Sequence, residues 1–286
     1  MADPDVTRRL AQLAEKLGYS TWCTLDNLAS PSPQPSHSPM DPQLPVIDSF
    51  VHLAFIAACT QTINLGTAVI ALPTRPALLT AKQVASLAYL SNGRVRLGVG
   101  IGYLELELKA AGVAFNERGS RTDEYLEAMR AIWSTDPVEY DGRYVNIHGV
   151  ASRPQPAQAP YIAVGGHADR ALRRAVQYGN AWIGGEGPAG PEEAIAKLDE
   201  LLAEGHRRPE LGALEVINMV DKLDEERLAK YEQLGVDETA IMFEHTHSEA
   251  DALSLLHECA PFVRATRAFT AKNAGQSSAR KLRLST

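Results

Sequence analysis

Short apolar runs alternate with amphipathic segments along most of the chain. Apolar residues between Val6 and Leu17 recur at helical spacing and a glycine follows them at position 18, which predicts a helix that ends there. Residues 20–25 then form a nearly continuous apolar run, which is typical of a buried strand. The predicted order therefore begins with a helix and continues with a strand.

The same alternation continues to about residue 260. Further strands are expected at residues 63–70, 95–99, 161–164, 181–183, 214–219 and 239–243. Helices are expected at residues 47–59, 77–90, 121–133, 168–177, 192–203, 225–234 and 249–260. Ser120 and Asp123 are placed as a capping pair for the helix at 121–133, and Asp141-Gly142 predicts the turn of a hairpin at 138–147. Short apolar strands between amphipathic helices indicate an α/β fold with a parallel sheet.

The number of predicted strands bears on how the sheet closes. The pattern gives about seven parallel strands, one fewer than the eight of a TIM barrel. The missing strand belongs at the front of the chain, where a helix comes first. Either that strand is absent and the tail, a loop or a partner subunit covers the gap, or the alternating segment 281–285 fills it; we favour an absent first strand.

Prolines mark a long loop within what we interpret as one domain. Residues 30–45 hold six of the 17 prolines, which removes backbone donors and rules out a helix there. Because the alternation resumes after this stretch, we expect a single barrel domain over residues 1–269, with insertions at 102–120 and 135–160. Residues 270–286 are expected to form a polar C-terminal tail.

Composition narrows the function classes. The chain has 28 basic and 35 acidic residues, so its formal charge is −7, which argues against nucleic acid as a partner. No apolar run approaches the roughly 20 residues that span a bilayer, and the acidic N-terminus is unlike a signal peptide. Cys23, Cys59 and Cys259 lie far apart in apolar runs and are expected to be reduced core thiols of a cytoplasmic protein.

Polar residues, glycines and the pair Ala68-Val69 gather just after the predicted strands. These residues are Asp26, Asn27, Ala68, Val69, Gly100, Gly102, Tyr103, Gly165, Gly166, His167, Gly184 and Gly185. In a parallel barrel the carboxyl ends of the strands form the active face. Gly165-Gly166 leads directly into a predicted helix, so free amides and the helix dipole there would suit an anion such as a phosphate. Three glycine clusters at one edge favour a ligand over plain turns.

Other kinds of site find less support. The glycines of residues 98–102 do not match the spacing of a dinucleotide-binding fingerprint. Glu244, His245 and His247 form an incomplete metal set, and a solvated loop is the favoured interpretation. The sequence has no G-x-S-x-G elbow, and Glu105 and Glu107 make no convincing acid pair, so hydrolysis has little support. Arg75 and Arg118 could each hold an anion or serve as an ion-pair partner.

An ordered string of motifs resembles a known family. The motifs are NLGTAVI at 64–70, AKQVASL at 81–87, GRVRLGVGIG at 93–102, ERGSRTDEY at 117–125, IAVGGHA at 162–168, ALRRA at 171–175 and GNAW at 179–182. Over residues 5–260 the chain resembles the bacterial luciferase-like monooxygenase superfamily, and most closely its branch of coenzyme F420-dependent oxidoreductases. This resemblance implies a TIM barrel that binds a flavin or deazaflavin over its mouth.

The resemblance also assigns expected roles to residues. A non-prolyl cis peptide in the bulge at Thr67-Ala68-Val69 is expected to back the cofactor ring. Gly165, Gly166 and His167 match the segment that receives the cofactor phosphate, and residues 100–103 match the wall beside the ring. F420 is preferred to FMN on the motifs alone, the substrate is expected to be a small organic molecule, and the resemblance favours a homodimer.

The chain departs from the family at three places. The usual first strand is missing, Asn27 stands where many relatives have His, and Tyr103 stands where some have Glu. Asn cannot exchange a proton near neutral pH, so Asp26, Asn27 and Tyr103 are expected to contact ring or substrate without an imidazole acid or base. Two alternatives remain open: an FMN-dependent monooxygenase, and a barrel that has lost redox chemistry and serves as a flavin-binding accessory protein or a cofactor-independent enzyme.

Overall fold

A computed structural model describes residues 3–34, 41–185, 190–243 and 248–273, with side chains described as far as residue 263. Its contacts divide the chain into two parts. We call residues 21–165 the central part, and residues 3–20 with 166–273 the outer part.

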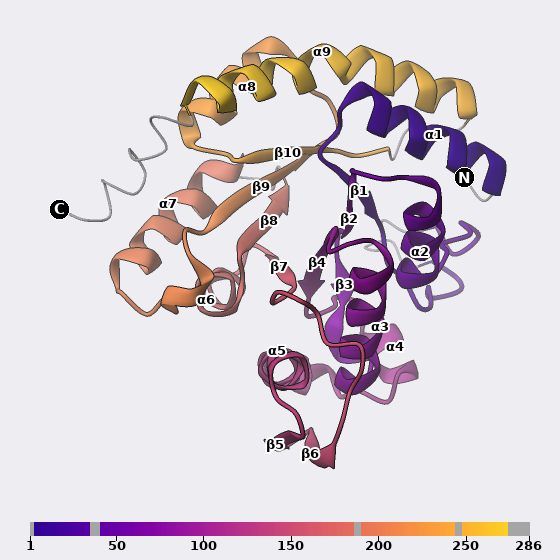
Figure 1. The fold of residues 1–286 in the computed structure, drawn as a ribbon. Coiled ribbons are helices and arrows are strands. Elements are labelled where there is room, and N and C mark those ends of the chain that lie inside the picture. Colours follow the sequence, from indigo (N-terminus) through magenta and orange to yellow (C-terminus); the bar gives the residue numbers. More distant parts are fainter. Residues whose placement is uncertain (1–2, 35–40, 186–189, 244–247, 274–286) are drawn as a thin grey trace. The chain divides into compact units, whose positions relative to one another are not determined.

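The central part is a parallel sheet whose strands are connected by helices. β1 (Thr21–Thr24), β2 (Asn64–Thr67), β4 (Val95–Gly100) and β7 (Tyr161–Gly165) pair in that order, and the short β3 (Ile70–Ala71) pairs with the end of β4. The helices between them are α2 (Ser49–Cys59), α3 (Ala77–Leu90), α4 (Glu105–Ala110) and α5 (Arg118–Ser134), with the 3-10 turns η1 (Leu72–Thr74) and η2 (Phe115–Glu117) (Figure 1).

A hairpin follows α5. β5 (Val138–Asp141) and β6 (Asn146–Val150) pair antiparallel, which confirms the hairpin predicted from Asp141-Gly142. The carboxylate of Glu124 on α5 accepts hydrogen bonds from three backbone amides of the turn, those of Arg143 (3.0 Å), Tyr144 (2.6 Å) and Val145 (2.8 Å). One α5 side chain therefore fixes the turn of the hairpin against the helix.

The outer part begins with α1 (Pro4–Leu17). Asp3 accepts hydrogen bonds from the amides of Asp5 and Val6, and Gly18 ends the helix in the left-handed conformation, with φ 96°. The predicted end of this helix at Gly18 is thus confirmed. Within the described residues α1 is the first element of the chain.

The rest of the outer part repeats strand and helix. β8 (Ala181–Gly185), β9 (Glu215–Val220) and β10 (Glu238–Ile241) form a parallel ladder in that order. α6 (Asp169–Tyr178), α7 (Gly190–Ala203), α8 (Glu225–Leu234) and α9 (Glu249–Asn273) alternate with them, with a 3-10 turn η3 (Pro209–Leu211) before β9. No helix in the described ranges is both long and apolar enough to cross a bilayer.

Three expectations from the sequence need correction. The stretch 102–120 is not irregular throughout, because it contains α4 and η2. α5 begins at Arg118 instead of Arg121, and Ser120 lies inside it, where its hydroxyl donates to the Glu117 carbonyl (3.1 Å). Cys259 is buried as expected, but Cys59 is half-buried and Cys23 is exposed, so Cys23 is not a core thiol. The tail segment 281–285 lies outside the described residues.

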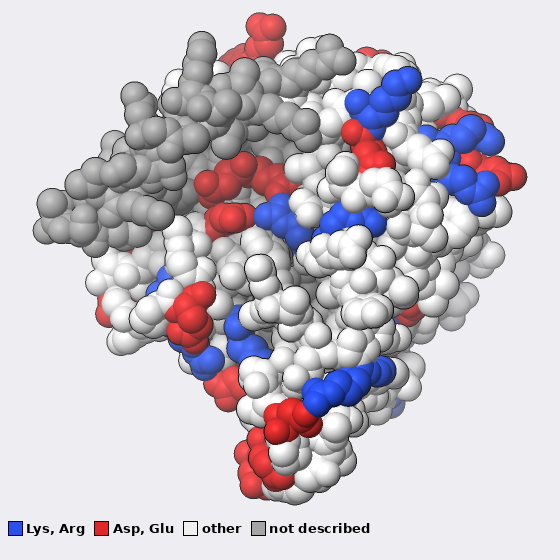
Figure 2. Space-filling model, in the orientation of Figure 1, with Lys and Arg blue, Asp and Glu red and all other residues white. Residues whose placement is uncertain are grey.

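The surface mixes charges of both signs. Figure 2 shows several separate groups in which Lys and Arg side chains lie next to Asp and Glu side chains, on a face that is otherwise mostly white. Ion pairs among the described residues include Arg9 with Glu249 (2.7 Å) and Arg227 with Asp221 (3.2 Å). Exposed pairs of this kind contribute little to stability, about 0–1 kcal/mol each.

Candidate active site

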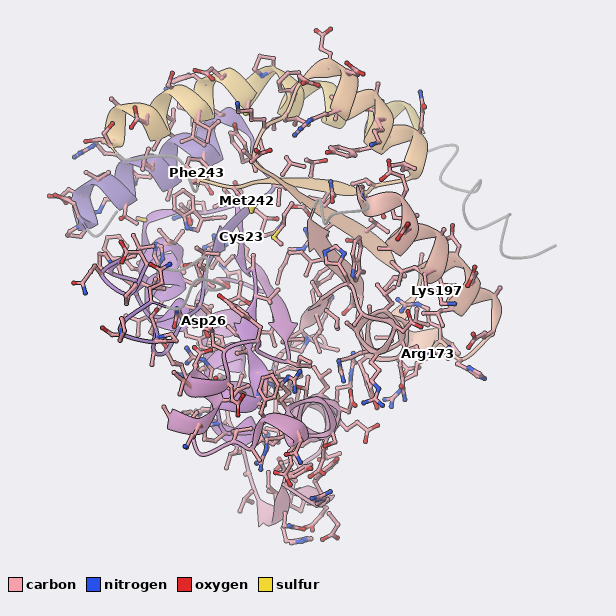
Figure 3. All side chains as sticks on the ribbon, turned by 180° about the vertical axis from the view of Figure 1, so that it is seen from behind. Cys23, Asp26, Arg173, Lys197, Met242 and Phe243 are labelled. Carbon is pink, nitrogen blue, oxygen red and sulfur yellow. The ribbon has the colours of Figure 1, made fainter. Side chains whose placement is uncertain are left out.

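Asp26 lies directly beyond β1 in a buried ion pair (Figure 3). Its Oδ1 accepts hydrogen bonds from Arg75 Nη2 (2.7 Å) and from the Ser49 hydroxyl (2.8 Å), and the two charged side chains are only 1% and 9% exposed. Arg75 Nη1 also lies 2.8 Å from Asp48 Oδ2. The interpretation of Arg75 as an ion-pair partner is therefore confirmed, and its guanidinium is committed to two carboxylates.

Asp48 has a second task as the N-cap of α2. Its Oδ1 accepts from the amides of Phe50 (3.0 Å) and Val51 (3.1 Å). Burial works to raise the pKa of Asp48, but the Val51 amide and the Arg75 guanidinium outweigh it, so the pKa is lowered. Arg75 therefore joins the two ends of the proline-rich loop, Asp26 before it and Asp48 after it.

Asn27 presents an amide oxygen that has no partner. Its Nδ2 donates to the Ser30 hydroxyl (2.8 Å), which fixes the side chain, while Oδ1 is buried and accepts no hydrogen bond within the described part of the chain. A buried acceptor without a partner is destabilising by about 1–3 kcal/mol. A ligand with an N–H or O–H group would satisfy it.

Glu107 is a buried carboxyl group that sequence reasoning considered only as half of an acid pair and set aside. It is 6% exposed on α4, and its Oε1 accepts from the amide of Leu28 (2.8 Å). Burial raises the pKa of Glu107, the Leu28 amide opposes this, and the nearby Asp26 carboxylate adds to the rise. Glu107 was not predicted as a site residue, because the helix that carries it is only six residues long and lies in a stretch that was predicted to be irregular.

The edge formed by β2, β3 and β4 carries a bulge. The hydroxyl of Thr67 accepts from the Gly98 amide (2.9 Å) and donates to the Gly98 carbonyl (2.7 Å), so a side chain replaces the ladder at this point. The Ala68–Val69 peptide is cis, as the resemblance implied. Ala68 and Val69 are both half-buried, and the Ala68 amide donates to the Thr24 carbonyl on β1 (2.9 Å).

The glycines after β4 leave little room for side chains. A Cβ at Gly100 would lie 3.0 Å from Val69 Cγ2, and Gly102 has φ +78°, a conformation that favours glycine. Tyr103, which follows, is 57% exposed. The central part therefore brings Asp26, Asn27, Ala68, Val69, Gly100, Gly102 and Tyr103 to the carboxyl ends of its strands.

Gly165 ends β7, and Gly166 opens the outer part just before α6. Gly166 has φ +121°, and a Cβ there would lie 2.9 Å from the Cβ of Ala171. The N-cap of α6 is Ala168, which offers no side-chain acceptor to the first amides of the helix. The backbone ahead of α6 is thus a cradle that a side chain would fill, beside amides that need an acceptor.

His167 lies at the same turn. The ring is exposed, its Nε2 accepts from the Gly185 amide (3.4 Å), and it meets the Trp182 ring edge-on at 5.5 Å. Trp182 Nε1 donates in turn to the Gly166 carbonyl (2.8 Å). These contacts bring Gly166, His167 and Gly185 together in the outer part.

Gly184 has a separate reason to lack a side chain. A Cβ there would lie 2.1 Å from the indole of Trp182, which is fully buried. The space beside Gly184 is therefore filled by the protein itself. Its role as a cofactor contact, like those of the other residues named after the strands, stays a prediction.

Cations near the α6 turn are mostly paired with acids. Arg173 on α6 and Lys197 on α7 extend from neighbouring helices (Figure 3). Arg173 lies 3.0 Å from Glu204 and Lys197 lies 2.6 Å from Glu200. Arg170, the second residue of α6, is exposed.

No group of three or more His, Cys, Asp or Glu in the described ranges could hold a metal ion. Glu244, His245 and His247 lie outside those ranges. Arg118, the second candidate for an anion, stacks on the Phe115 ring at 3.5 Å and donates to the Phe115 carbonyl (2.6 Å). The structure therefore places Arg118 at the start of α5, with its guanidinium against Phe115.

Comparison with known proteins decides the family. A family model described as luciferase-like monooxygenase matches residues 2–278. The chain belongs to this family. This luciferase-like chain is 36% identical over 248 residues to an uncharacterised protein of Mycobacterium tuberculosis, covering 82% of the chain and 83% of that relative.

Two relatives have named activities. The F420-dependent glucose-6-phosphate dehydrogenase of Nocardia farcinica is 34% identical over 206 residues, covering 68% of this chain and 57% of the relative. The FMNH(2)-dependent dimethylsulfone monooxygenase of Pseudomonas fluorescens is 30% identical over 203 residues, covering 70% of this chain and 52% of the relative. The luciferase-like chain thus spans little more than half the length of each of these two enzymes.

Solved structures agree on the fold. The coenzyme F420-dependent tetrahydromethanopterin reductase of Methanopyrus kandleri matches with a TM-score of 0.65 at 16% identity, covering 89% of this chain and 94% of that chain. A monooxygenase from Streptomyces bottropensis matches with a TM-score of 0.63 at 22% identity, covering 92% of this chain and 77% of that chain. The fold is therefore of the luciferase-like, TIM-barrel class, as the sequence predicted.

Proposed function

We propose that this luciferase-like protein is an oxidoreductase that uses a flavin or deazaflavin, F420 in preference to FMN, to act on a small organic substrate. Family membership supports the general class. The relatives with named activities use F420 or FMNH2, so both cofactors stay within the proposal. The preference for F420 rests on the motifs at residues 64–125 and 162–182.

The observation that carries the proposal is the turn ahead of α6. Gly166 adopts φ +121°, a Cβ there would meet Ala171 at 2.9 Å, and the N-cap Ala168 leaves the first amides of the helix without a side-chain acceptor. Amides at a helix N-terminus are a ready site for phosphate. F420 and FMN both carry a phosphate beyond the ring, so these residues fit either cofactor.

Two groups of residues have proposed roles toward the cofactor. Gly165 and Gly166, with the His167 imidazole and the Gly185 amide, would bind the phosphate. Ala68 and Val69 with Gly100 and Gly102 would lie against the ring, since they bring backbone to the carboxyl ends of β2 and β4. The bound cofactor supplies hydride transfer or oxygen activation, while the protein supplies binding and orientation.

The polar residues at the end of β1 would orient the substrate. Asn27 Oδ1 is positioned by the bond from Nδ2 to Ser30 and can accept a hydrogen bond from a substrate hydroxyl or N–H group. Asp26 is held by Arg75 and stabilises the backbone that carries Asn27. Tyr103, exposed beyond β4, would stack on the bound molecule or donate a hydrogen bond to it.

Titration of the purified protein with F420 and with FMN, followed by fluorescence quenching, tests the proposal. We expect saturable binding of F420, and weaker binding of FMN. His167→Glu should weaken the binding by about tenfold or more, because a carboxylate repels the phosphate at close range. His167→Gln, which adds no charge, is the matched control and should have a much smaller effect.

Gly166→Glu gives a second test, since it places a carboxylate in the cradle itself. If the wild-type protein bound neither F420 nor FMN, the redox function would be refuted. Equal affinity of the wild type and His167→Glu would show that the phosphate binds elsewhere. Tight FMN binding with oxygen consumption would favour a monooxygenase.

Three further expectations belong to the same proposal. They are a cytoplasmic location, a single barrel domain over residues 1–269 and a homodimer as the working state. The first is tested by fractionation of cells that express the protein, and the second by limited proteolysis.

A further inference from the structure

Exposed apolar side chains come from three segments of the central part that lie near Asn27. These segments supply half of the large apolar side chains that the described residues expose. We call them the apolar rim, which comprises Leu25, Leu28, Leu44, Ile47, Tyr103 and Leu106. Leu28 is 44% exposed and Leu106 is 58% exposed. An exposed apolar patch of this kind marks a binding surface.

Hydrogen bonds join the three segments of the apolar rim. The amide of Leu28 donates to Glu107 Oε1 (2.8 Å), which connects the segment after β1 to α4 and to the two rim residues near that helix. The hydroxyl of Ser49 donates to the Leu25 carbonyl (3.0 Å), which connects the same segment to the start of α2. The apolar rim therefore belongs to one edge of the central part, at the place where Figure 3 labels Asp26.

A buried acceptor lies in the same segment as Leu25 and Leu28. It is Asn27 Oδ1, which has no hydrogen-bond partner among the described residues, while Nδ2 of the same side chain is held by the Ser30 hydroxyl (2.8 Å). Sites for small molecules are mostly apolar and carry a few placed polar groups that fix the orientation of the ligand. The apolar rim together with Asn27 has this composition.

The charges at this edge do not favour an anionic ligand. The Arg75 guanidinium is committed to the carboxylates of Asp26 (2.7 Å) and Asp48 (2.8 Å). Lys109 is exposed on α4, but Glu105, one turn before it on the same helix, is exposed as well and offsets its charge. Recognition of a carboxylate or phosphate uses a cation that can form charge-assisted hydrogen bonds with it. An uncharged ligand fits this edge better.

We propose that the substrate of this site is an uncharged, largely apolar molecule with one O–H or N–H group. Its apolar portion covers the apolar rim, and its donor bonds to Asn27 Oδ1. Such a hydrogen bond discriminates between ligands, because a molecule without the donor leaves a buried acceptor unpaired. The inference rests on the proposed function, which places the substrate at the end of β1, and it adds the chemical class of that substrate.

Titration calorimetry with probes of one chain length tests the proposal. Octanol and octanamide carry a neutral donor, methyl octyl ether has no donor, and octanoate is an anion. We expect octanol or octanamide to bind once per chain and at least about tenfold more tightly than the ether and octanoate. The better of the two identifies the donor as O–H or N–H. Ether or octanoate binding as tight as that of both donors, or several octanol molecules per chain, would overturn the proposal.

Variants separate the acceptor from the apolar rim. Asn27→Leu keeps the size of the side chain and removes the acceptor, so octanol should then bind no more tightly than the ether. Leu106→Gln should weaken octanol binding by about fivefold to tenfold, because apolar contact is lost. Val150→Gln, on an exposed apolar residue of β6, is the matched control and should bind octanol as the wild type does. Unchanged discrimination in Asn27→Leu, or wild-type affinity in Leu106→Gln, would contradict the assignment.

Cofactor titration of the same samples distinguishes this inference from the proposed function. Octanol binding is measured in the protein alone and with saturating F420. If the wild type bound octanol selectively but bound neither F420 nor FMN, the redox function would fail and the ligand class would stand. If it bound F420 without discriminating octanol from octanoate, the ligand class alone would fail. Thermal unfolding of each variant should match that of the wild type, because the Leu106 and Val150 side chains are exposed and Asn27 is half-buried.

Discussion

Gly98 shows how one residue permits the local structure of the proposed site. The hydroxyl of Thr67 forms hydrogen bonds with both the amide and the carbonyl of Gly98. This brings the two strands so close that a Cβ at Gly98 would lie 1.9 Å from the Thr67 carbonyl oxygen. The bulge and the glycine therefore depend on each other.

Gly98→Ala should destabilise the fold by about 3 kcal/mol or more, because a rigid backbone atom stands where the methyl group would go. Gly66→Ala is the matched control on the neighbouring strand, since its Cβ would meet the Sγ of the exposed Cys23 at 2.8 Å and that side chain can rotate away. Gly66→Ala should lower the free energy of unfolding by less than about 1 kcal/mol. Urea denaturation measures both, and equal losses would contradict the account.

Glu107 gives a pH-dependent prediction at the same scale. Burial raises its pKa in the folded protein, so the folded state holds this proton more tightly than the unfolded state does. The resulting stabilisation is complete below the ordinary Glu pKa of about 4.3 and is lost as the pH rises through the raised value. Glu107→Gln removes this loss and keeps an acceptor for the Leu28 amide.

The free energy of unfolding of Glu107→Gln, relative to the wild type, should therefore increase from about pH 4.3 to pH 7. Chemical denaturation over this range measures it. Glu105→Gln on the exposed side of α4 serves as the control and should run parallel to the wild type. A constant difference between Glu107→Gln and the wild type would show that Glu107 is not perturbed.

At the scale of elements, Arg75 connects β1, α2 and the start of α3. Its guanidinium holds Asp26 after β1 and Asp48 before α2, so it closes the proline-rich loop at both ends. The Ser49 hydroxyl adds bonds to the Leu25 carbonyl (3.0 Å) and to Asp26. The described ends of the loop between β1 and α2 are therefore anchored by a buried ionic cluster.

Arg75→Met should destabilise the protein by about 3 kcal/mol, because it leaves the buried Asp26 carboxylate without a partner. Asp26→Asn combined with Arg75→Met should recover part of this loss, since no unpaired charge then remains. Thermal and urea unfolding of the single and double variants measure the coupling. Strictly additive losses, or a loss below about 1 kcal/mol for Arg75→Met, would contradict a buried pair.

Element boundaries show where sequence patterns reach their limit. The hairpin was predicted because Asp141-Gly142 is a strong local turn signal, and α1 because Gly18 ends it. α4 was missed because its six residues are too few to show a helical period, and the start of α5 was missed because its N-cap, Glu117, makes no side-chain capping hydrogen bond. Neither feature leaves a pattern long enough to recognise.

Contacts between residues far apart in the chain could not be predicted from the sequence either. The Asp26–Arg75 pair joins positions 49 residues apart, and periodicity says nothing about such a pairing. The exposure of Cys23 escaped as well, because an apolar run does not reveal which side of a strand is covered. The cis peptide at Ala68–Val69 was expected only from the family resemblance.

At the scale of the whole molecule, alternation predicted an α/β barrel and motifs predicted the family. Both predictions are confirmed by the family match and by the solved structures. The predicted site residues lie at the carboxyl ends of their strands, within the central part and within the outer part. Their roles toward a cofactor remain proposals.

Hydrogen exchange of backbone amides tests the central claim most directly. We expect saturating F420, and to a lesser degree FMN, to slow exchange in the segment from Gly166 to Arg170, where phosphate would accept from the first amides of α6, and at Gly185, whose amide donates to His167 at 3.4 Å in the structure. Peptides from α8, which has no part in the site, report on general stabilisation. Saturable cofactor binding with unchanged exchange at Gly166–Arg170 would contradict a phosphate held by these amides.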